Sequence, residues 1–417
     1  MLKHIKMSNH KIINYCQISG SKKLNKIINL GFLPPVNEMF KIKKANINHN
    51  FFNTELYFSS KSNLVQINTI VDKKIIFPKS YPYTSSTTKI LRDNFKNLRN
   101  EVDKLFSKIN KKFILDIGSN DGNLLQNFKG KYKVLGVTPE NIGKIAIKNG
   151  IPTILDYFNA KVCENIIKKH GKPNIVTATN VFAHIDKPLE LLKNILSLLE
   201  KKNGIFISES HYLIPLLKDI QYDTVYHEHL RYYCLRSLNF LFKKFGLRIF
   251  KVQKINTHGG SIRVYATKSK MYRTENSVKK ILQEEKKYLN KKFFLKFTKK
   301  VVQSKLDLYK LLSSLKKQNK IIYGVSAPSR ATTLINFVGL DENIIDCVLE
   351  IDGSKKIGNY IPGTKIPIYS EKILRKKKPD YLIIFSWHIF KEIKKNLKKK
   401  GFKGKFIIPL PNPKILN

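Results

Sequence analysis

The chain has 417 residues, 42% of them hydrophobic, and its 78 Lys and Arg against 30 Asp and Glu give a formal net charge of +48. This length predicts two or three domains with packed cores. The lysines are spread along the whole chain without a zinc-finger, RRM or basic-zipper pattern. We therefore favour a lysine-rich composition over a nucleic-acid-binding surface, although such a field would attract an anionic substrate.

The four cysteines are far apart in the sequence, at Cys16, Cys163, Cys234 and Cys347. Without a Cys-x-x-Cys pair they support neither a disulfide scaffold nor a cysteine zinc site, and they suit a reducing compartment. No secretory signal is evident, and no apolar run reaches the roughly 18 residues of a membrane helix. We expect a cytoplasmic monomer or weak homodimer with no membrane or nucleic-acid partner.

Residues 1–88 predict a small β-rich or loop-rich domain, because short apolar pieces alternate with polar runs and with Pro34-Pro35. Residues 89–272 alternate strands with helices. Strands are predicted at 113–117, 132–137, 174–178 and 205–207. Helices are predicted from Asn123, at 142–148 and after Asp186, which is placed to cap a leucine-rich helix. This alternation predicts a mostly parallel, doubly wound α/β sheet with helices on both faces.

The last third of the chain predicts two further parts. Residues 273–318 are rich in Lys, Leu and Glu, without Gly or Pro, and predict a helical connector. From Lys320 a second strand–helix pattern begins, so residues 319–417 predict a C-terminal Rossmann-like α/β domain.

The first strand of the central domain runs into a glycine turn, DIGSNDG (116–122). A glycine turn at the carboxyl end of such a strand lets backbone approach a ligand closely. The Gly118-x-x-x-Gly122 spacing differs from the dinucleotide pattern and resembles motif I of class I S-adenosylmethionine (SAM) methyltransferases. The alternative is a simple tight turn. The second strand is followed by Thr138 where an acid is expected for the ribose, with Glu140 two residues later.

The run YHEH (226–229) places two histidines around a carboxylate. A histidine titrates near neutral pH and suits proton transfer, and an adjacent carboxylate can orient it. The two histidines could instead bind a metal, or belong to the core. We favour a general base, because a cofactor loop is present and carbon methylation needs a base.

Two more polar clusters are candidate pocket segments. Asn180 and His184 follow the third strand, at the sheet edge that faces the cofactor in this architecture. The run THGGS (257–261) could be a strand bend that approaches a ligand, or a hairpin turn.

The order of these motifs identifies a family resemblance. The runs DIGSNDG, NVFAHI, YHEHLRYYCLRSL, THGGSIRVY, GVSAPSRATTLINFVG and IPGTKIPI occur between Cys16 and Pro367. Together they resemble the three-domain nucleotide-sugar C-methyltransferases. That resemblance implies a small zinc-binding N-terminal domain, a central SAM domain and a C-terminal α/β domain. It also implies methylation at C-3 of a 4-keto deoxysugar linked to a nucleoside diphosphate.

The resemblance assigns roles to residues of this chain. It implies His229 as the base, in a catalytic group with Tyr226, Glu228 and His184. The implied SAM contacts are Tyr83, Asp116, Gly118, Asn120, Gly122 and Asn180. The implied substrate contacts are Tyr81, His227, His258, Gly259 and Arg330. Arg330 and the turn 324–330, which opens a helix, could bind the diphosphate or simply start that helix.

The N-terminal domain departs from the family at its metal ligands. The first expected Cys-x-x-Cys pair is Cys16 and Ser19, and the second is Ser59 and Ser62. Serine is a poor zinc ligand beside thiolate. We therefore expect SAM as the cofactor and no zinc.

Two rival functions remain open from the sequence. A SAM-dependent O- or N-methyltransferase of another glycan or small metabolite would use the same cofactor loop and a similar base. A basic, non-enzymatic binding protein is the second rival, and the intact YHEH run argues against it.

Overall fold

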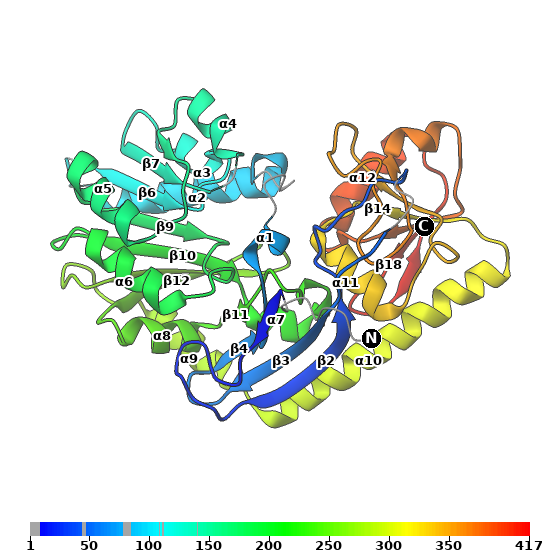
Figure 1. Ribbon diagram of the computed structural model, residues 1–417, viewed down its shortest axis with the longest axis horizontal. Helices are drawn as coiled ribbons and strands as arrows, with labels where there is room; N and C mark the ends of the chain where they lie inside the picture. Colours follow the sequence, from blue (N-terminus) through cyan, green and yellow to red (C-terminus); the bar gives the residue numbers. More distant parts are fainter. Residues whose placement is uncertain (1–8, 44–46, 78–84, 108, 111, 140) are drawn as a thin grey trace, which may run out of the picture.

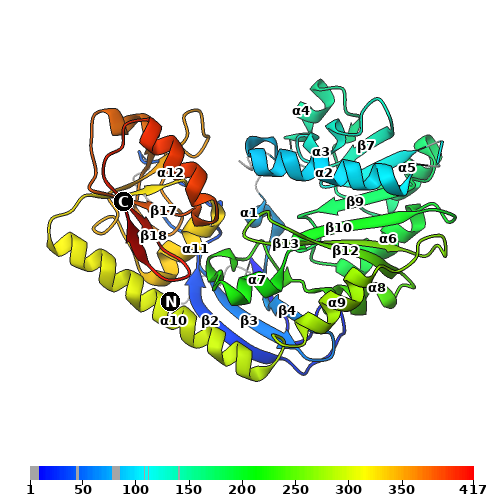
Figure 2. The ribbon, with the colours of Figure 1, turned by 180° about the vertical axis from the view of Figure 1, so that it is seen from behind.

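The computed structural model describes residues 9–43, 47–77, 85–107, 109–110, 112–139 and 141–417. Two α/β units stand side by side above a small antiparallel sheet, and the long helix α10 (Lys291–Lys317) runs beneath that sheet to the C-terminal unit (Figure 1, Figure 2). No helix in the described part of the chain is long and apolar enough to cross a membrane.

The small sheet is built mainly from the N-terminal residues. Its strand order is β11-β4-β3-β2, with β2 (Asn25–Leu33), β3 (Phe52–Ser59), β4 (Leu64–Ile67) and β11 (Arg231–Tyr232), all antiparallel. A second pair joins β1 (His10–Ile12) to β5 (Thr69–Val71), before the short helix α1 (Lys73–Ile76). Because β11 comes from the YHEH region, the catalytic candidates continue directly into this sheet.

The central sheet has seven strands in the order β12-β13-β10-β9-β6-β7-β8. These are β6 (Phe113–Ile117), β7 (Lys133–Val137), β8 (Thr153–Ile154), β9 (Ile175–Thr179), β10 (Ile205–His211), β12 (Arg248–Ile255) and β13 (Ser261–Thr267). The strands from β6 to β10 are mutually parallel, and β13 is antiparallel to both of its neighbours.

Helices cover both faces of the central sheet. One face packs against α2 (Lys89–Leu105), α3 (Asn123–Gln126) and α4 (Gly143–Lys148). The other packs against α5 (Ala160–His170), α6 (Pro188–Leu198) and α8 (Leu235–Lys243). The predicted strands and the doubly wound arrangement are confirmed. The predicted cap is wrong: the cap position is Lys187, Pro188 opens the helix, and Asp186 instead pairs with Lys73 at 3.1 Å.

The connector consists of two helices, α9 (Asn276–Glu285) and α10, where the sequence pattern predicts one helical stretch. The break falls at Asn290, whose side chain accepts the Phe293 amide hydrogen and so caps α10. An asparagine at that position satisfies an amide that a continuous helix would bond internally.

The C-terminal sheet has the order β16-β15-β14-β17-β18-β19, parallel except for β19. Its strands are β14 (Ile322–Val325), β15 (Cys347–Glu350), β16 (Ile368–Ser370), β17 (Tyr381–Ile384), β18 (Lys405–Ile408) and β19 (Lys414–Leu416). Its helices are α11 (Ser329–Val338), which faces the rest of the molecule, and α12 (Phe390–Lys399) on the opposite face. The predicted second α/β pattern is thus present.

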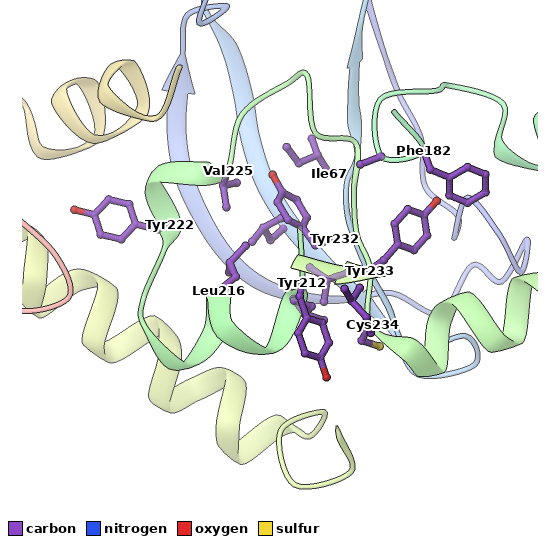
Figure 3. Close-up of a cluster of buried hydrophobic side chains, with 14 of the residues drawn as sticks. Ile67, Phe182, Tyr212, Leu216, Tyr222, Val225, Tyr232, Tyr233 and Cys234 are labelled. Carbon is purple, nitrogen blue, oxygen red and sulfur yellow. The ribbon is translucent and has the colours of Figure 1, made fainter. Parts of the chain in front are cut away.

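A buried aromatic cluster fixes the segment that carries the YHEH run (Figure 3). Tyr222, Tyr232 and Tyr233 are at most 1% exposed, and they lie among α7 (Leu213–Lys218), β4 and β11. Tyr212 in the same cluster donates its hydroxyl hydrogen to Glu285 at 2.9 Å. Large rings packed this tightly give the neighbouring polar residues a rigid base.

Candidate active site

The glycine turn after β6 needs its glycines. Gly118 and Gly122 have φ of +72° and +79°, in the left-handed region that favours glycine. A Cβ on Gly118 would lie 2.3 Å from Val181 Cγ2, and a Cβ on Gly122 would lie 2.9 Å from Ala146 Cβ. The turn is therefore held by close packing, with Val181 of the next loop pressed against it.

The predicted cofactor contacts in this turn differ in their accessibility. Asp116 is 2% exposed, accepts a hydrogen bond from Thr177 Oγ1 at 2.6 Å, and has its pKa raised to about 7 by burial. Asn120 is left-handed and accepts the Ser85 amide hydrogen at 3.0 Å. Thr138 is fully buried at the end of β7, so that position brings no carboxylate to a ribose.

A short turn after β9 connects the glycine turn with the YHEH run. It begins at Asn180, which is left-handed and whose amide hydrogen bonds to the Glu209 carbonyl at 2.7 Å. Val181 then meets Gly118, and the ring of His184 lies 5.0 Å from the ring of His229. The structure thus brings Gly118, Asn180, His184 and His229 into one region.

His229 is oriented by a backbone carbonyl. Its Nδ1 lies 3.0 Å from the Thr224 carbonyl oxygen, which only accepts, so Nδ1 carries the hydrogen and Nε2 keeps its lone pair. Burial lowers the pKa of His229 well below its usual value, and the neighbouring His184 lowers it further. The Tyr226 ring stacks on the imidazole at 4.3 Å with a tilt of 31°. His229 is therefore a neutral imidazole of fixed orientation, with the lone pair on Nε2.

The other members of the run face elsewhere. His227 points to the N-terminal sheet, where its Nε2 lies 3.2 Å from Thr54 Oγ1 and its ring meets Phe52 edge-on. The Glu228 carboxylate accepts a hydrogen bond from Asn37 Nδ2 at 2.5 Å, while the Glu228 backbone carbonyl holds His184 Nδ1 at 2.7 Å. The structure therefore keeps Tyr226 and His229 together and turns His227 and Glu228 away from them, and the Glu228 backbone carbonyl contacts His184.

Arg231, which the sequence reasoning missed, braces this region. It is 1% exposed and donates to the carbonyls of Phe182, Ala183 and Ile185, in the loop that carries His184. Its Nη1 also donates to Gln17 of the N-terminal domain. An arginine inside the apolar run LRYYCL was the available signal, because such a residue is buried only when it is paired.

A second missed group supports the end of β10. Glu209 and Arg263 are at most 1% exposed and form an ion pair at 2.7 Å. Asn94 donates to Glu209 at 2.8 Å and accepts from Arg263 at 2.6 Å, which satisfies both charges. Thr257 donates to Glu209 at 3.4 Å, so this buried group also holds the start of the THGGS loop.

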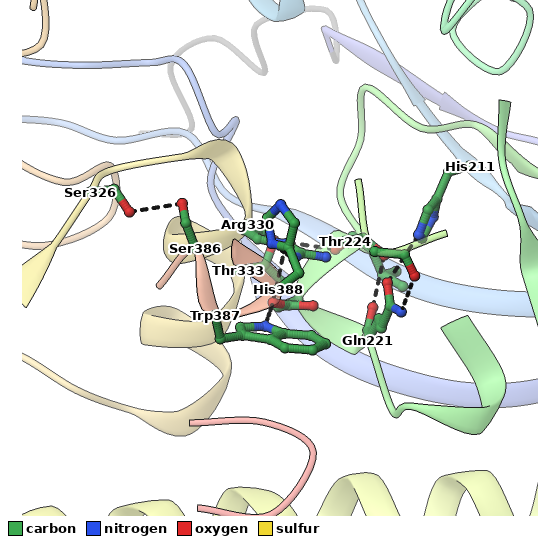
Figure 4. A network of polar contacts seen from close by, with 12 residues as sticks. His211, Gln221, Thr224, Ser326, Arg330, Thr333, Ser386, Trp387 and His388 are labelled. Carbon is green, nitrogen blue, oxygen red and sulfur yellow. Dashed lines mark hydrogen bonds and ion pairs between the residues drawn. The ribbon is translucent and has the colours of Figure 1, made fainter. Parts of the chain in front are cut away.

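The THGGS loop contacts Gln221, which Figure 4 labels beside His211. His258, Gly259 and Gly260 have φ of +54°, +85° and +121° in succession. The Gly259 carbonyl accepts from Gln221 at 2.7 Å, and Gln221 accepts from His211 Nε2 at 3.1 Å. Nε2 of His258 is buried without a hydrogen-bond partner. Both glycine turn and unpaired imidazole are consistent with the predicted substrate contacts at His258 and Gly259.

Arg330 lies between the two α/β units (Figure 4). Its Nε forms an ion pair with Asp223 at 3.3 Å, and its Nη1 donates to His388 Nδ1 at 2.7 Å. The guanidinium also lies over the Trp387 ring at 5.2 Å, and Trp387 Nε1 donates to Asp223 at 2.8 Å. Arg330 Nη2 is buried and has no hydrogen-bond partner.

The turn before α11 already holds an anion from its own chain. The Ala327 amide hydrogen bonds to Glu350 Oε1 at 2.7 Å, and the Ser326 amide bonds to the Leu349 carbonyl at 2.7 Å. Lys356 donates to the Ala327 carbonyl at 2.5 Å. The amides of Ser326 and Ala327 are thus occupied, whereas Arg330 Nη2 is a buried donor without a hydrogen-bond partner. The predicted site residues Tyr81 and Tyr83 lie outside the described residues.

Comparison with known proteins decides the family. Family models match residues 16–77 ("Putative zinc binding domain"), 90–252 ("Methyltransferase domain") and 256–411 ("C-methyltransferase C-terminal domain"). The curated C-methyltransferase NovU of Streptomyces niveus is 27% identical over 413 residues, which cover 97% of each chain. This chain belongs to the three-domain C-methyltransferase family. It is a SAM-dependent methyltransferase, and its seven-stranded unit has the class I fold.

Two solved methyltransferase structures are similar to part of this chain. The plantazolicin methyltransferase BpumL, in complex with a pentazolic desmethylPZN analog and SAH, is 13% identical with a TM-score of 0.35, over 44% of this chain and 87% of that chain. A S-adenosylmethionine-dependent methyltransferase from Clostridium acetobutylicum ATCC 824 is 15% identical with a TM-score of 0.33, over 44% and 94%.

The two groups that the family implies differ in how well this chain fits them. The glycine turn at Gly118 and Gly122, which no larger residue could replace without collision, fits SAM. The residues at the zinc positions, Cys16 with Ser19, Ser59 and Ser62, do not fit a zinc ion that prefers thiolate and imidazole. Among the residues that the structure describes, no three His, Cys, Asp or Glu side chains gather to hold a metal.

Proposed function

We propose that this methyltransferase transfers a methyl group to C-3 of a 4-keto deoxysugar linked to a nucleoside diphosphate. The observation that carries the proposal is His229, a neutral imidazole whose Nδ1–H is held by the Thr224 carbonyl, which leaves Nε2 as the base. It lies beside the turn that links it to the SAM loop. A C–H next to a ketone is acidic enough for such a base, whereas an ordinary sugar C–H is not.

His229 Nε2 takes the C-3 proton, and the C–H electron pair moves into a C-3 to C-4 double bond as the ketone oxygen becomes an enolate. Bound SAM supplies an electrophilic methyl group on its sulfonium. Held at the turn of Gly118 and Gly122, SAM would give that methyl group to the enolate carbon, and the electron pair of the S–CH₃ bond would stay on sulfur. Alignment of the two reactants can supply about 7–11 kcal/mol of the barrier reduction.

Tyr226 is the donor that we assign to the enolate oxygen. His184 is the other candidate, but its Nδ1–H is engaged by the Glu228 carbonyl, and burial lowers its pKa to about 4. A neutral His184 therefore carries no hydrogen on Nε2 and cannot donate from it. The Tyr226 ring stacks on His229, so the hydroxyl that this ring carries lies in the same region as the base.

The diphosphate is assigned to Arg330. Its Nη2 is buried without a partner, and an unsatisfied guanidinium nitrogen gains one charge-assisted hydrogen bond from a phosphate oxygen. His211 and His258 lie close enough to Arg330 for its charge to lower their pKa values. A bound diphosphate would reverse that effect and stabilise their protonated forms.

Proton exchange separates the base from the methyl transfer. The enzyme is incubated in D₂O with S-adenosylhomocysteine and a nucleotide-linked 4-keto deoxysugar, and deuterium at C-3 is followed by NMR. We expect exchange with the unmodified enzyme and its loss in His229→Ala, by about 10²–10⁴-fold, with S-adenosylhomocysteine binding unchanged. His170→Ala, at the end of α5, is the matched control.

The same sugar with SAM gives the second readout. A new C–CH₃ signal supports the proposal, and an O–CH₃ or N–CH₃ signal would overturn it in favour of the rival acceptor. Retained exchange in His229→Ala would remove His229 as the base.

A further inference from the structure

The N-terminal domain contains two turns of the same shape. The first is Cys16-Gln17-Ile18-Ser19 and the second is Ser59-Ser60-Lys61-Ser62. Each is followed at once by a left-handed residue, Gly20 with φ +72° and Asn63 with φ +57°. Two equal turns, each with a side chain at its first and fourth positions, are the arrangement that lets four ligands surround one metal ion.

The side chains at those positions converge although no thiolate set is present. Cys16 Sγ lies 3.1 Å from Ser62 Oγ, and both residues are at most 1% exposed. Ser59 is also buried, and its Oγ has no hydrogen-bond partner, so the two turns meet at the contact between Cys16 and Ser62.

The first turn also contacts the active-site brace. Gln17 lies between Cys16 and Ser19, and its Oε1 accepts from Arg231, which holds the His184 loop. Its backbone amide donates to Gln66 at 2.9 Å, and its side-chain amide donates to the Ile67 carbonyl at 2.9 Å. The position of this turn therefore sets the position of Arg231.

Other contacts hold the same sheet without a metal. Lys244 donates to the Ile18 carbonyl at 3.0 Å, and Thr298 of α10 donates to the Ile27 carbonyl at 2.8 Å. Strand β11 extends the sheet from the central unit, through the pairs Arg231 with Gln66 and Tyr232 with Val65. These contacts join residues that are distant in the sequence. The rest of the molecule therefore stabilises this sheet, as a bound ion stabilises a small zinc domain.

We propose that the Cys16, Ser19, Ser59 and Ser62 cluster is a metal-free replacement of a zinc site, which holds Gln17 against Arg231 by hydrogen bonds and keeps the geometry of the lost ligands. Three substitutions, Ser19→Cys, Ser59→Cys and Ser62→Cys together, should then rebuild a tetrahedral four-thiolate site. The inference does not depend on the substrate, because metal content and thermal unfolding are its readouts.

The test compares three full-length proteins under reducing conditions, loaded with Zn²⁺ or Co²⁺ and then dialysed. We expect the natural chain to retain no metal. The triple variant should retain one equivalent, show the thiolate charge-transfer and tetrahedral absorption bands with Co²⁺, and melt at a lower temperature once a chelator removes the metal. The matched control is Ser19→Cys with Ser60→Cys and Ser62→Cys. Ser60 is exposed, so a cysteine at that position would lie outside the cluster.

Two results would contradict the proposal. One equivalent of zinc in the natural chain, lost in Cys16→Ser, would overturn the proposal, because the site would still be a metal site. Equal metal binding by the triple variant and its Ser60 control would also overturn it. Should the triple variant fail to fold, the natural chain still decides through two measurements. We expect its melting temperature to be the same with and without the chelator. Gln17→Leu should lower that temperature more than Cys16→Ala, since only Gln17→Leu removes the acceptor of Arg231 Nη1.

Discussion

Each of the two α/β units has a turn at the carboxyl end of its first strand, and the amides of the two turns have different hydrogen-bond partners. In the central unit β6 ends at Ile117, and the amides of the left-handed Gly118 and Gly122 bond to the backbone carbonyls of Val137 and Ser119. In the C-terminal unit β14 runs into a turn whose Ala327 amide is bonded to Glu350 of the neighbouring strand. The turn between strand and helix is thus closed by backbone carbonyls in the first unit and by the chain's own carboxylate in the second.

The difference shows that topology alone does not make a ligand site. Both turns lie at the carboxyl ends of parallel strands, where ligands bind in such sheets. In the C-terminal unit the available donor is a side chain, Arg330 Nη2, and it faces the central unit through the Asp223 ion pair. The second unit therefore contacts the first unit through the Arg330–Asp223 ion pair. Substitutions at either turn can test this difference between the units.

The largest effect is expected at Gly118. Alanine there would bring a Cβ within 2.3 Å of Val181 Cγ2 and hold a left-handed conformation that costs roughly 1–2 kcal/mol. We expect Gly118→Ala to weaken S-adenosylhomocysteine binding by more than tenfold in calorimetric titration. Gly353→Ala is the control, since Gly353 has φ of +81° with open space around it. Equal binding loss in both variants would show that stability, and not the turn, is affected.

The next effect is expected at Arg330. Arg330→Met leaves Asp223 buried without its charge partner, which costs about 3–5 kcal/mol of unfolding free energy. The double variant Arg330→Met with Asp223→Asn removes both charges and should recover most of that stability. If Arg330 also binds the diphosphate, the double variant still shows a raised KM for the nucleotide sugar with S-adenosylhomocysteine binding unchanged. An unchanged KM would make Arg330 a structural residue only.

A smaller, pH-dependent effect is expected from Asp116. Burial raises the pKa of its carboxyl to about 7, so between pH 4 and 7 the folded state binds a proton that the unfolded state has released. Stability from this group is complete below pH 4 and is lost as pH rises through 7, by at most about 4 kcal/mol at 1.36 kcal/mol per pKa unit. Asp116→Asn should flatten that part of the profile in denaturant titrations. An unchanged slope would contradict the raised pKa.

Much of the fold could be predicted because its signals are local. The strand Phe113–Ile117 is apolar throughout and runs into glycines that only a tight turn explains, and the structure places both there. The motif order also identified the family before any contact was known. Asp186 shows the limit, because a capping side chain was predicted where Pro188 starts the helix and Lys73, over a hundred residues earlier, takes the carboxylate.

The sequence predicts which residue types form the candidate site better than it predicts where their side chains point. YHEH is one sequence run, yet His229 and His227 contact different parts of the molecule, because β11 and the buried tyrosines fix the backbone on either side of the run. Arg231 and Glu209 were missed because their partners are distant in sequence: Gln17 for the first, and Asn94 with Arg263 for the second. Long-range pairs of this kind leave no periodic pattern.

The smallest effect is expected at Glu350, and it tests the comparison most directly. Glu350→Gln keeps an acceptor for the Ala327 amide but removes the charge that occupies the turn. The hydrogen bond loses its charge assistance, so we expect a loss of about 1 kcal/mol or less in unfolding free energy. With the carboxylate gone, the turn and the nearby Lys356 should favour an anion more strongly, and inorganic pyrophosphate should compete better with the nucleotide sugar. Unchanged competition would mean that the turn is closed by its geometry, and that Arg330 alone carries the anion contact from this unit.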